Sequence, residues 1–183
     1  MWHAAKVLSG PSPEPVTLAM ARTQCRVDAT DTTYDSDLNR MIAAARAHVE
    51  VYCSIRLGAQ TVEVECDSFA DMARLSEAPV ASVTSIAYTD LAGETQTLST
   101  DVYERRSSGY EASVILKDGQ SWPAIKRGSR IKMTAVVGVD PVPADIVEAM
   151  LLKIAERFFG REDGKQEDWT ALDALLCNHR RYP

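Results

Sequence analysis

The stretch from residue 35 to residue 57, DSDLNRMIAAARAHVEVYCSIRL, constrains the fold of this chain more than any other. Its hydrophobic residues recur at intervals of three and four, at Leu38, Met41, Ile42, Ala45, Val49, Tyr52 and Cys53. This spacing is typical of an amphipathic helix with one buried face. Asp35 or Ser36 can cap its start, because a short side-chain oxygen accepts an unpaired backbone N–H of the first turn. A helix this long needs a partner that covers its hydrophobic face.

We expect that partner to be a second long helix over residues 144–159. Its hydrophobic residues form a broad face and are Ile146, Val147, Met150, Leu151, Ile154, Ala155 and Phe158. Asp145 can cap its start, and Gly160 is placed to end it. The pattern also predicts a short helix within residues 16–27, capped by Thr17, and another over residues 168–177.

Between the two long helices the hydrophobic period changes from helical to alternating. Gln60 to Cys66, QTVEVEC, alternates as a half-buried strand does, and residues 130–137, RIKMTAVV, suit a strand inside a sheet. Shorter strands are expected within residues 79–116, with DLAGE at 90–94 as a hairpin turn. We therefore predict an α+β fold that is mainly an α-helical bundle, with long helices at about 35–57 and 144–159. An antiparallel β meander is inserted at about 60–137.

The first fifteen residues differ in composition from the rest of the chain. Pro11, Pro13 and Pro15 lie close to Gly10, and proline both fixes φ and lacks a backbone donor. We predict an extended N-terminal arm over residues 1–15 and a single domain over residues 16–183. Within this domain, the β insertion is 60–137 and the C-terminal segment is 166–183.

Composition and charge exclude several classes of protein. The 183 residues carry a net charge of −6, which argues against a protein that grips nucleic acid through its phosphates. The start of the chain lacks the pattern of a signal peptide, and no stretch is long and hydrophobic enough for a membrane span. The four cysteines form no CxxC pair, so we interpret them as reduced thiols of a cytoplasmic product.

No arrangement of residues in the sequence predicts catalysis. The motifs GxSxG, GxxxxGK[ST], HExxH and GxGxxG are absent, and the three histidines are scattered. Cys177 and His179 are two residues apart, but a metal site needs further ligands. His48 is better explained as packed or solvated than as catalytic, and Glu63 with Glu65 as a solvated strand face. We expect no enzyme activity, no cofactor and no metal.

The strongest signal outside the expected core lies at the C-terminus. A compact hydrophobic stripe precedes a basic and aromatic tail: Trp169, Leu172, Leu175 and Leu176, then Arg180, Arg181 and Tyr182. The expected helix is too short to be stable alone. It either completes the core of its own domain or docks against another chain, since aromatic residues and arginine are favoured at interfaces.

Several segments, in this order, carry a resemblance to a known family. They are PVTLAMARTQCRVD, the stretch from residue 35, APVASVTSIAYTDLAGETQTLSTDVYE, DGQSWPAIKRGSRIKMTAVVGVD and VPADIVEAMLLKIAERFFGRED. They resemble the head–tail connectors of long-tailed phages, also called adaptor or head-completion proteins, which occur in phage-like gene transfer agents as well. The family commonly has a proline-led "SV" strand, a Trp-Pro pair before a basic strand, and a P-x-x-I-x-x-A-x-L-L helix. The resemblance runs from about Pro15 to the end.

The resemblance implies a structural virion protein. Copies of it would form a ring, taken as dodecameric, that binds the portal protein at the portal vertex and extends the DNA channel. The ring would be the platform for the stopper or tail-terminator protein, and DNA would pass through it without specific binding. The protein would be assembled in the bacterial cytoplasm, lie at the head–tail interface of the virion or phage-like particle, and contact no membrane.

The resemblance also assigns a docking site. In such proteins the C-terminal region contacts the portal, so the implied docking residues are Trp169, Leu172, Leu176, Arg180, Arg181 and Tyr182. Two alternatives remain: a small monomeric adaptor or assembly chaperone, and an enzyme whose site is not recognised.

Overall fold

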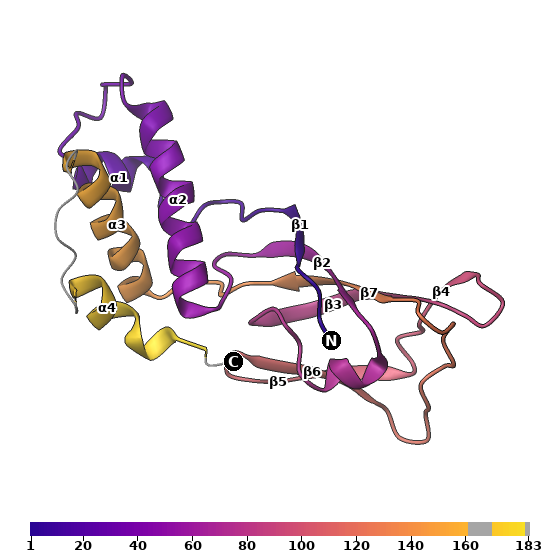
Figure 1. The fold of residues 1–183 in the computed structure, drawn as a ribbon. Helices are drawn as coiled ribbons and strands as arrows, with labels where there is room; N and C mark the ends of the chain where they lie inside the picture. The colour runs from indigo at the N-terminus through magenta and orange to yellow at the C-terminus, as the bar shows by residue number, and fades with distance from the viewer. Residues whose placement is uncertain (161–169, 182–183) are drawn as a thin grey trace. The chain divides into compact units, whose positions relative to one another are not determined.

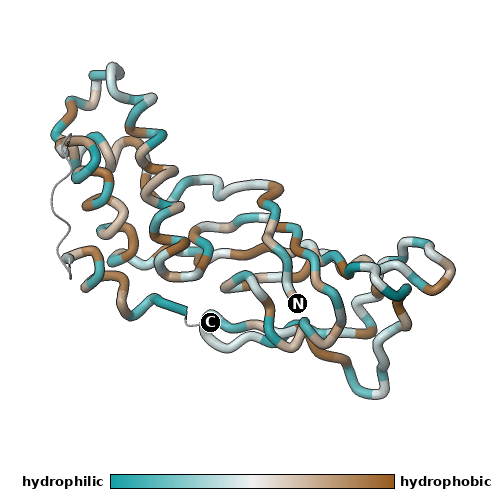
Figure 2. The backbone as a smooth tube through the Cα atoms, in the orientation of Figure 1, coloured by the Kyte–Doolittle hydropathy of each residue, from teal (hydrophilic) through white to brown (hydrophobic). Residues whose placement is uncertain are grey.

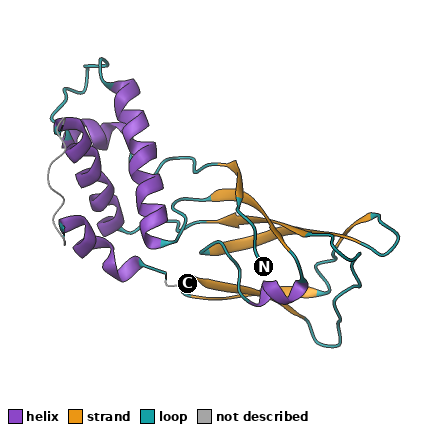
Figure 3. Cartoon of the chain, in the orientation of Figure 1, coloured by secondary structure: helices purple, strands orange, loops and turns teal. Residues whose placement is uncertain are grey.

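The computed structural model describes residues 1–160 and 170–181. The chain divides into two compact units, each formed by separate stretches of sequence. Met1–Gly10 and Ala59–Gly138 form the first, which we call the sheet unit. Pro11–Gly58 and Val139–Pro183 form the second, the helical unit. Figure 1 labels the elements of each unit, and Figure 3 separates helices from strands by colour.

The sheet unit is built on a five-stranded antiparallel sheet with strand order β1-β2-β7-β3-β4. The strands are β1 Lys6–Ser9, β2 Gln60–Cys66, β3 Val80–Thr89, β4 Thr95–Thr97 and β7 Ile131–Val137. Both β2 and β7 alternate fully buried residues with partly exposed ones, as the sequence predicts. Figure 2 shows the resulting alternation of hydrophobic and hydrophilic residues.

A two-stranded antiparallel sheet completes this unit. Its strands are β5 Tyr103–Ser108 and β6 Glu111–Leu116, which lie within the region where short strands are predicted. A 3-10 helix, η1 Phe69–Ala73, begins with a capping box in which Ser68 and Asp71 bond each other's backbone. Both sheets and η1 contribute to one hydrophobic cluster, and Trp122 stacks on Phe69 with ring centroids 4.6 Å apart.

The N-terminal residues add an edge strand to the sheet. β1 pairs with β2, with Lys6 opposite Glu63 and Val7 opposite Val62. The indole N–H of Trp2 donates to the carbonyl oxygens of Asp71 and Arg74, at 3.1 and 2.9 Å. The start of the chain, which precedes the prolines, is therefore ordered by the pairing of β1 with β2.

The turn between β3 and β4 matches the predicted hairpin at residues 90–94. Gly93 has a φ of +92°, which residues with a side chain rarely adopt. The Asp90 N–H donates to the Glu94 carbonyl at 2.9 Å, and the Asp90 carboxylate accepts from the Glu94 N–H at 2.9 Å. These bonds hold the turn in a defined shape.

The helical unit contains α1 Leu18–Gln24, α2 Asp35–Cys53, α3 Ala144–Phe159, α4 Ala171–Leu176 and the 3-10 helix η2 Cys177–His179. The predicted faces of the long helices are largely buried, including Leu38, Ile42 and Val49 of α2 with Met150 and Ile154 of α3. The helix of residues 144–159 is therefore confirmed. The Thr17 cap is confirmed too, since its hydroxyl accepts the Met20 N–H at 3.2 Å.

Helix α2 ends at Cys53, four residues before the predicted end. Ser54 takes a left-handed conformation with a φ of 56°, which breaks the helical hydrogen-bond pattern. The turn that follows buries Ile55 and Leu57, and the buried Glu50 carboxylate accepts the Leu57 N–H at 3.0 Å. The hydrophobic pattern past Cys53 reflects burial of this turn, which the helical spacing did not distinguish from a longer helix.

The prediction of a mainly α-helical bundle is wrong. The fold is mixed α/β, with a five-stranded antiparallel sheet, a two-stranded sheet and four α-helices in the described residues. The physical reason is that the strands of residues 60–137 bury a large hydrophobic cluster of their own. These strands form a compact unit of their own, and a strand from the N-terminal segment extends their sheet.

Candidate functional site

The C-terminal segment of the helical unit is held partly by hydrophobic burial. Leu176 is fully buried, whereas Leu172 and Leu175 are only partly buried. Leu176 therefore contributes to the core of its own unit. Leu172 and Leu175 of α4 each remain partly exposed.

Asp173 connects the start of α4 to α2. Its carboxylate accepts the Thr170 N–H at 2.8 Å and the Thr170 hydroxyl at 2.7 Å, which closes a capping box. The Tyr52 hydroxyl of α2 donates to its other oxygen at 2.6 Å. The hydrogen bonds from Thr170 and Tyr52 lower the pKa of Asp173 to about 2, because each favours the charged carboxylate.

Three contacts hold the end of the described chain. The His179 imidazole lies 2.6 Å from the Asp145 carboxylate, an interaction that lowers the pKa of Asp145. The Arg181 N–H donates to the carbonyl of Cys53 at 2.8 Å. The Arg180 guanidinium lies 4.9 Å from the ring centroid of Tyr52, in a cation–π arrangement.

The predicted docking residues have different environments in the structure. Leu176 is buried, Leu172 and Arg181 are partly buried, and Arg180 is exposed. Trp169 and Tyr182 lie outside the described residues. The structure brings Leu172, Leu176, Arg180 and Arg181 into the same C-terminal segment of the helical unit, and their docking role remains a prediction.

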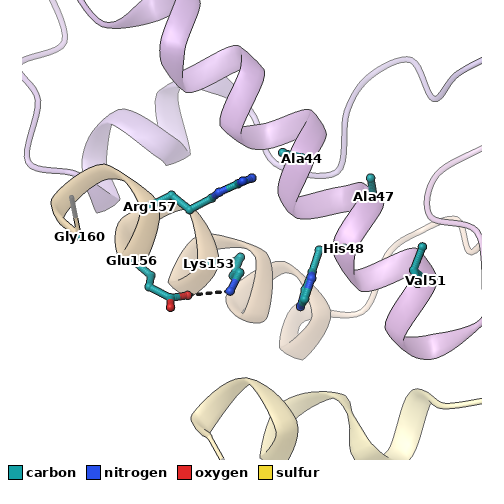
Figure 4. Close-up of a pocket in the computed structure, with 8 residues that line it drawn as sticks. All are labelled: Ala44, Ala47, His48, Val51, Lys153, Glu156, Arg157 and Gly160. Carbon is teal, nitrogen blue, oxygen red and sulfur yellow. Dashed lines mark hydrogen bonds and ion pairs between the residues drawn. The ribbon is translucent and has the colours of Figure 1, made fainter. Parts of the chain in front are cut away.

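A groove of about 560 Å³ runs between α2 and α3 of the helical unit. It is lined by Ala44, Ala47, His48 and Val51 from α2, and by Lys153, Glu156, Arg157 and Gly160. In Figure 4, Arg157 extends from α3 towards α2, His48 extends from α2 towards α3, and a dashed line joins Lys153 to Glu156. Alanine side chains leave this space open because they are too short to fill it.

Charges of both signs surround His48 in the groove. Partial burial lowers the pKa of His48, and the nearby charges of Lys153 and Arg157 lower it further, while Glu156 and Asp173 act in the opposite direction. The Lys153 amine lies 2.9 Å from the Glu156 carboxylate, so these two charges largely offset each other. The Arg157 side chain is exposed at the groove and forms no ion pair with a described residue.

Two strand carboxylates and two buried cysteines have well-defined environments. Glu63 and Glu65 pair with Lys132 at 3.4 Å and Arg130 at 2.9 Å on the strand surface, as a solvated face would. Burial raises the pKa of the Cys53 and Cys66 thiols to about 11, which disfavours the reactive thiolate at pH 7.

Two further observations concern the described residues alone. No group of three or more histidine, cysteine, aspartate or glutamate side chains among them could hold a metal ion. None of the helices formed by residues 1–160 and 170–181 is both long and apolar enough to cross a membrane.

Sequence reasoning missed the Tyr52–Asp173 contact and the groove. The stretch Thr170-Ala-Leu-Asp173 is a capping-box pattern with aspartate in the third position, so the start of α4 could have been found from the sequence. The partner Tyr52 is 121 residues away, and no local pattern indicates it.

Comparison with known proteins gives a consistent result at the level of the fold. No protein-family model matches the chain, and no curated protein sequence matches it. Among solved structures, a chain in the neck of an empty gene transfer agent particle, computed with C6 symmetry, superposes with a TM-score of 0.82 at 19% identity. A chain in the virion of a native gene transfer agent particle superposes with a TM-score of 0.81 at 21% identity.

A third chain comes from the neck of a native gene transfer agent particle, computed with C12 symmetry, and has a TM-score of 0.74 at 20% identity. Each match covers 99% of this chain and 97% of the other. This protein therefore shares the fold of chains found in gene transfer agent particles, over nearly its whole length.

Proposed function

We propose that this protein is a structural component of the neck of a phage-like particle, where it forms a ring and serves as the head–tail connector. The observation that carries the proposal is the fold shared over 99% of the chain with chains of gene transfer agent necks. The sequence resemblance described above points to the same family independently. In this role the ring binds the portal protein and presents its other face to the stopper or tail-terminator protein.

The charge of the chain supports a channel role. The net charge of −6 repels the phosphate backbone, so DNA passes a ring of such subunits without specific binding. The necks that contain the similar chains were computed with C6 and C12 symmetry. Cyclic symmetry requires a head-to-tail contact between two different surfaces of each subunit. A ring of this protein needs two such surfaces.

The C-terminal segment is the proposed portal-docking site. Leu172 is partly exposed and Arg180 is exposed, whereas Leu176 is buried and packs the segment against the core of its unit. Trp169, Arg181 and Tyr182 complete the proposed set. The polar contacts of Tyr52, Asp145 and Cys53 hold this segment in place, so little conformational entropy is lost when a partner binds it.

The decisive experiment is electron microscopy of the purified protein, alone and mixed with the portal protein encoded in the same gene cluster. We expect rings of the protein, either free or seated on the portal. A protein that stays monomeric and does not bind the portal at high concentration would contradict the proposal. A monomeric adaptor, an assembly chaperone or an enzyme would then be the better interpretation of this protein.

The docking residues can be tested in the same assay. Leu172→Asp combined with Arg180→Glu should abolish portal binding, while circular dichroism keeps the wild-type helical signal and the unfolding transition shifts only modestly through loss of the Arg180–Tyr52 contact. Phe159→Asp is the matched control, because Phe159 is 61% exposed on the helical unit but lies outside the proposed site. Unchanged portal binding by the double variant would refute the C-terminal site without affecting the ring proposal.

A further inference from the structure

The groove between α2 and α3 is lined by the exposed side chains of Val51 and Arg157. Val51 is 81% exposed at the groove wall. Arg157 is exposed and makes no ion pair with any residue that the structure describes, although its neighbours Lys153 and Glu156 pair with each other. An exposed valine next to a cation and two alanines is a surface that an apolar residue with an adjacent carboxylate can occupy.

The β3–β4 turn of the sheet unit carries the complementary features. Leu91 is 72% exposed, and the residues from 91 to 97 are all exposed. The Asp90 carboxylate is used within the turn, where it accepts from the Glu94 N–H and from the Gln96 side chain at 3.0 Å. The Glu94 carboxylate makes no ion pair with another described residue. Figure 1 shows this turn projecting from the end of its sheet.

The charge at the turn is negative despite one nearby lysine. The Lys126 amine lies 3.4 Å from the position that a Cβ on Gly93 would occupy, so one cation approaches the turn that carries Asp90 and Glu94. Among the described residues, neither Glu94 at the turn nor Arg157 at the groove forms an ion pair, and their charges are opposite. The hydrogen bonds of Asp90 keep the turn rigid, which lowers the entropy that binding would cost.

We propose that the β3–β4 turn of one copy docks into the α2–α3 groove of the next copy, with Leu91 against Val51 and Glu94 facing Arg157. This inference deepens the proposed function, on which it rests, by naming the two surfaces that join neighbouring subunits of the ring. The contact joins two different surfaces, which is the type of interface that closes a ring by rotation. The occupant of the groove is a second copy of this chain. Glu94 of the turn is opposite in charge to Arg157 of the groove, and the exposed Leu91 matches the exposed Val51.

Disulfide trapping tests which surfaces meet. The variant carries Val51→Cys and Leu91→Cys in a Cys177→Ser background, since Cys25, Cys53 and Cys66 are buried. Oxidation of rings, formed alone or on the portal, should give a ladder of covalent dimers and higher oligomers. The matched control, Val51→Cys with Leu8→Cys, pairs the groove with the exposed edge strand β1 and should stay monomeric. A cross-link confined to one chain, or rings without a ladder, overturns the inference.

Charge exchange tests the polar part of the contact. Glu94→Arg should raise the protein concentration needed for ring assembly by at least about tenfold, because it places two cations together. Adding Arg157→Glu should restore assembly, which a purely structural role of either residue would not produce. Asp118→Arg is the control, since Asp118 is exposed in another loop of the sheet unit and should assemble normally.

The outcomes separate this inference from the proposed function. If the wild-type protein forms rings and the Glu94 variant assembles equally well, the interface is wrong while the connector role stands. If the wild-type protein forms no ring with or without the portal, the proposed function fails and the interface fails with it.

Discussion

The sheet unit and the helical unit place their charged residues differently. In the sheet unit, carboxylates such as Glu63 and Glu65 lie on a partly exposed strand face and pair with cations of the neighbouring strand. In the helical unit, Glu50 is only 7% exposed and lies on the buried side of α2. Its carboxylate accepts the Leu57 N–H at 3.0 Å and lies 3.3 Å from Arg46 and 3.6 Å from Arg56.

The difference shows two ways to define a packing arrangement. Alternating burial sets the register of β2 against β7, because a shift by one residue would expose every buried side chain. Helices tolerate rotation and sliding more readily, so the helical unit needs specific polar contacts that join residues distant in sequence. Arg22 with Asp35, Glu14 with Arg46 and Tyr52 with Asp173 are contacts of this kind.

The largest expected effect is at Glu50. Glu50→Ala should reduce the free energy of unfolding by about 3 kcal/mol, because it leaves the partly buried Arg46 and Arg56 without their shared carboxylate. Glu63→Ala, the matched change on the sheet unit, should cost less than about 1 kcal/mol because its pair with Lys132 is partly solvated. Urea unfolding of both variants measures the difference. Equal losses of unfolding free energy would show that the ion pairs of the two units contribute equally to stability.

The sheet unit could be predicted from sequence where alternation was strict. The bounds of β2 match the prediction, and the turn at Gly93 was recognised from DLAGE. The edge strand β1 was missed because its four residues are all exposed, so they show no alternation in burial. Tertiary pairing with β2, and not a local pattern, makes this segment a strand.

The candidate site was less accessible to sequence reasoning. The hydrophobic stripe of α4 is visible in the sequence, but only the structure separates the buried Leu176 from the partly exposed Leu172. The groove depends on which faces of α2 and α3 meet, and that is decided by packing between residues about 100 positions apart. Periodicity locates a helical face but does not identify its partner.

The second prediction concerns Asp173, the residue that connects α4 to α2. Its pKa is lowered to about 2, below the usual value, so its bonds stabilise the fold above the unfolded-state pKa and are lost as pH falls through the folded-state pKa. Asp173→Asn should therefore lower Tm by a constant amount near neutral pH. The difference from wild type should shrink between about pH 4 and pH 2. A gap that persists unchanged at pH 2 would contradict the role of the charged carboxylate.

The smallest expected effects are at two tyrosine hydroxyls, and they oppose each other. Tyr103 is 5% exposed in the sheet unit, and its hydroxyl has no hydrogen-bond partner among the described residues. Tyr103→Phe should leave stability within about 0.5 kcal/mol of wild type or increase it, because a buried unpaired hydroxyl is a cost. Tyr52→Phe should lose about 1 kcal/mol, since the Tyr52 hydroxyl donates to the Asp173 carboxylate.

The tyrosine pair tests whether polar contacts matter in only one of the two units. Urea unfolding gives the free-energy changes, and amide hydrogen exchange assigns each change to a unit, because local opening is measured residue by residue. Faster exchange in α4 of Tyr52→Phe, with the sheet unit unchanged, would confirm that the long-range bond holds the C-terminal segment. A substantial loss in Tyr103→Phe would mean that the hydroxyl is paired in solution, and the sheet unit would then also depend on a buried polar contact.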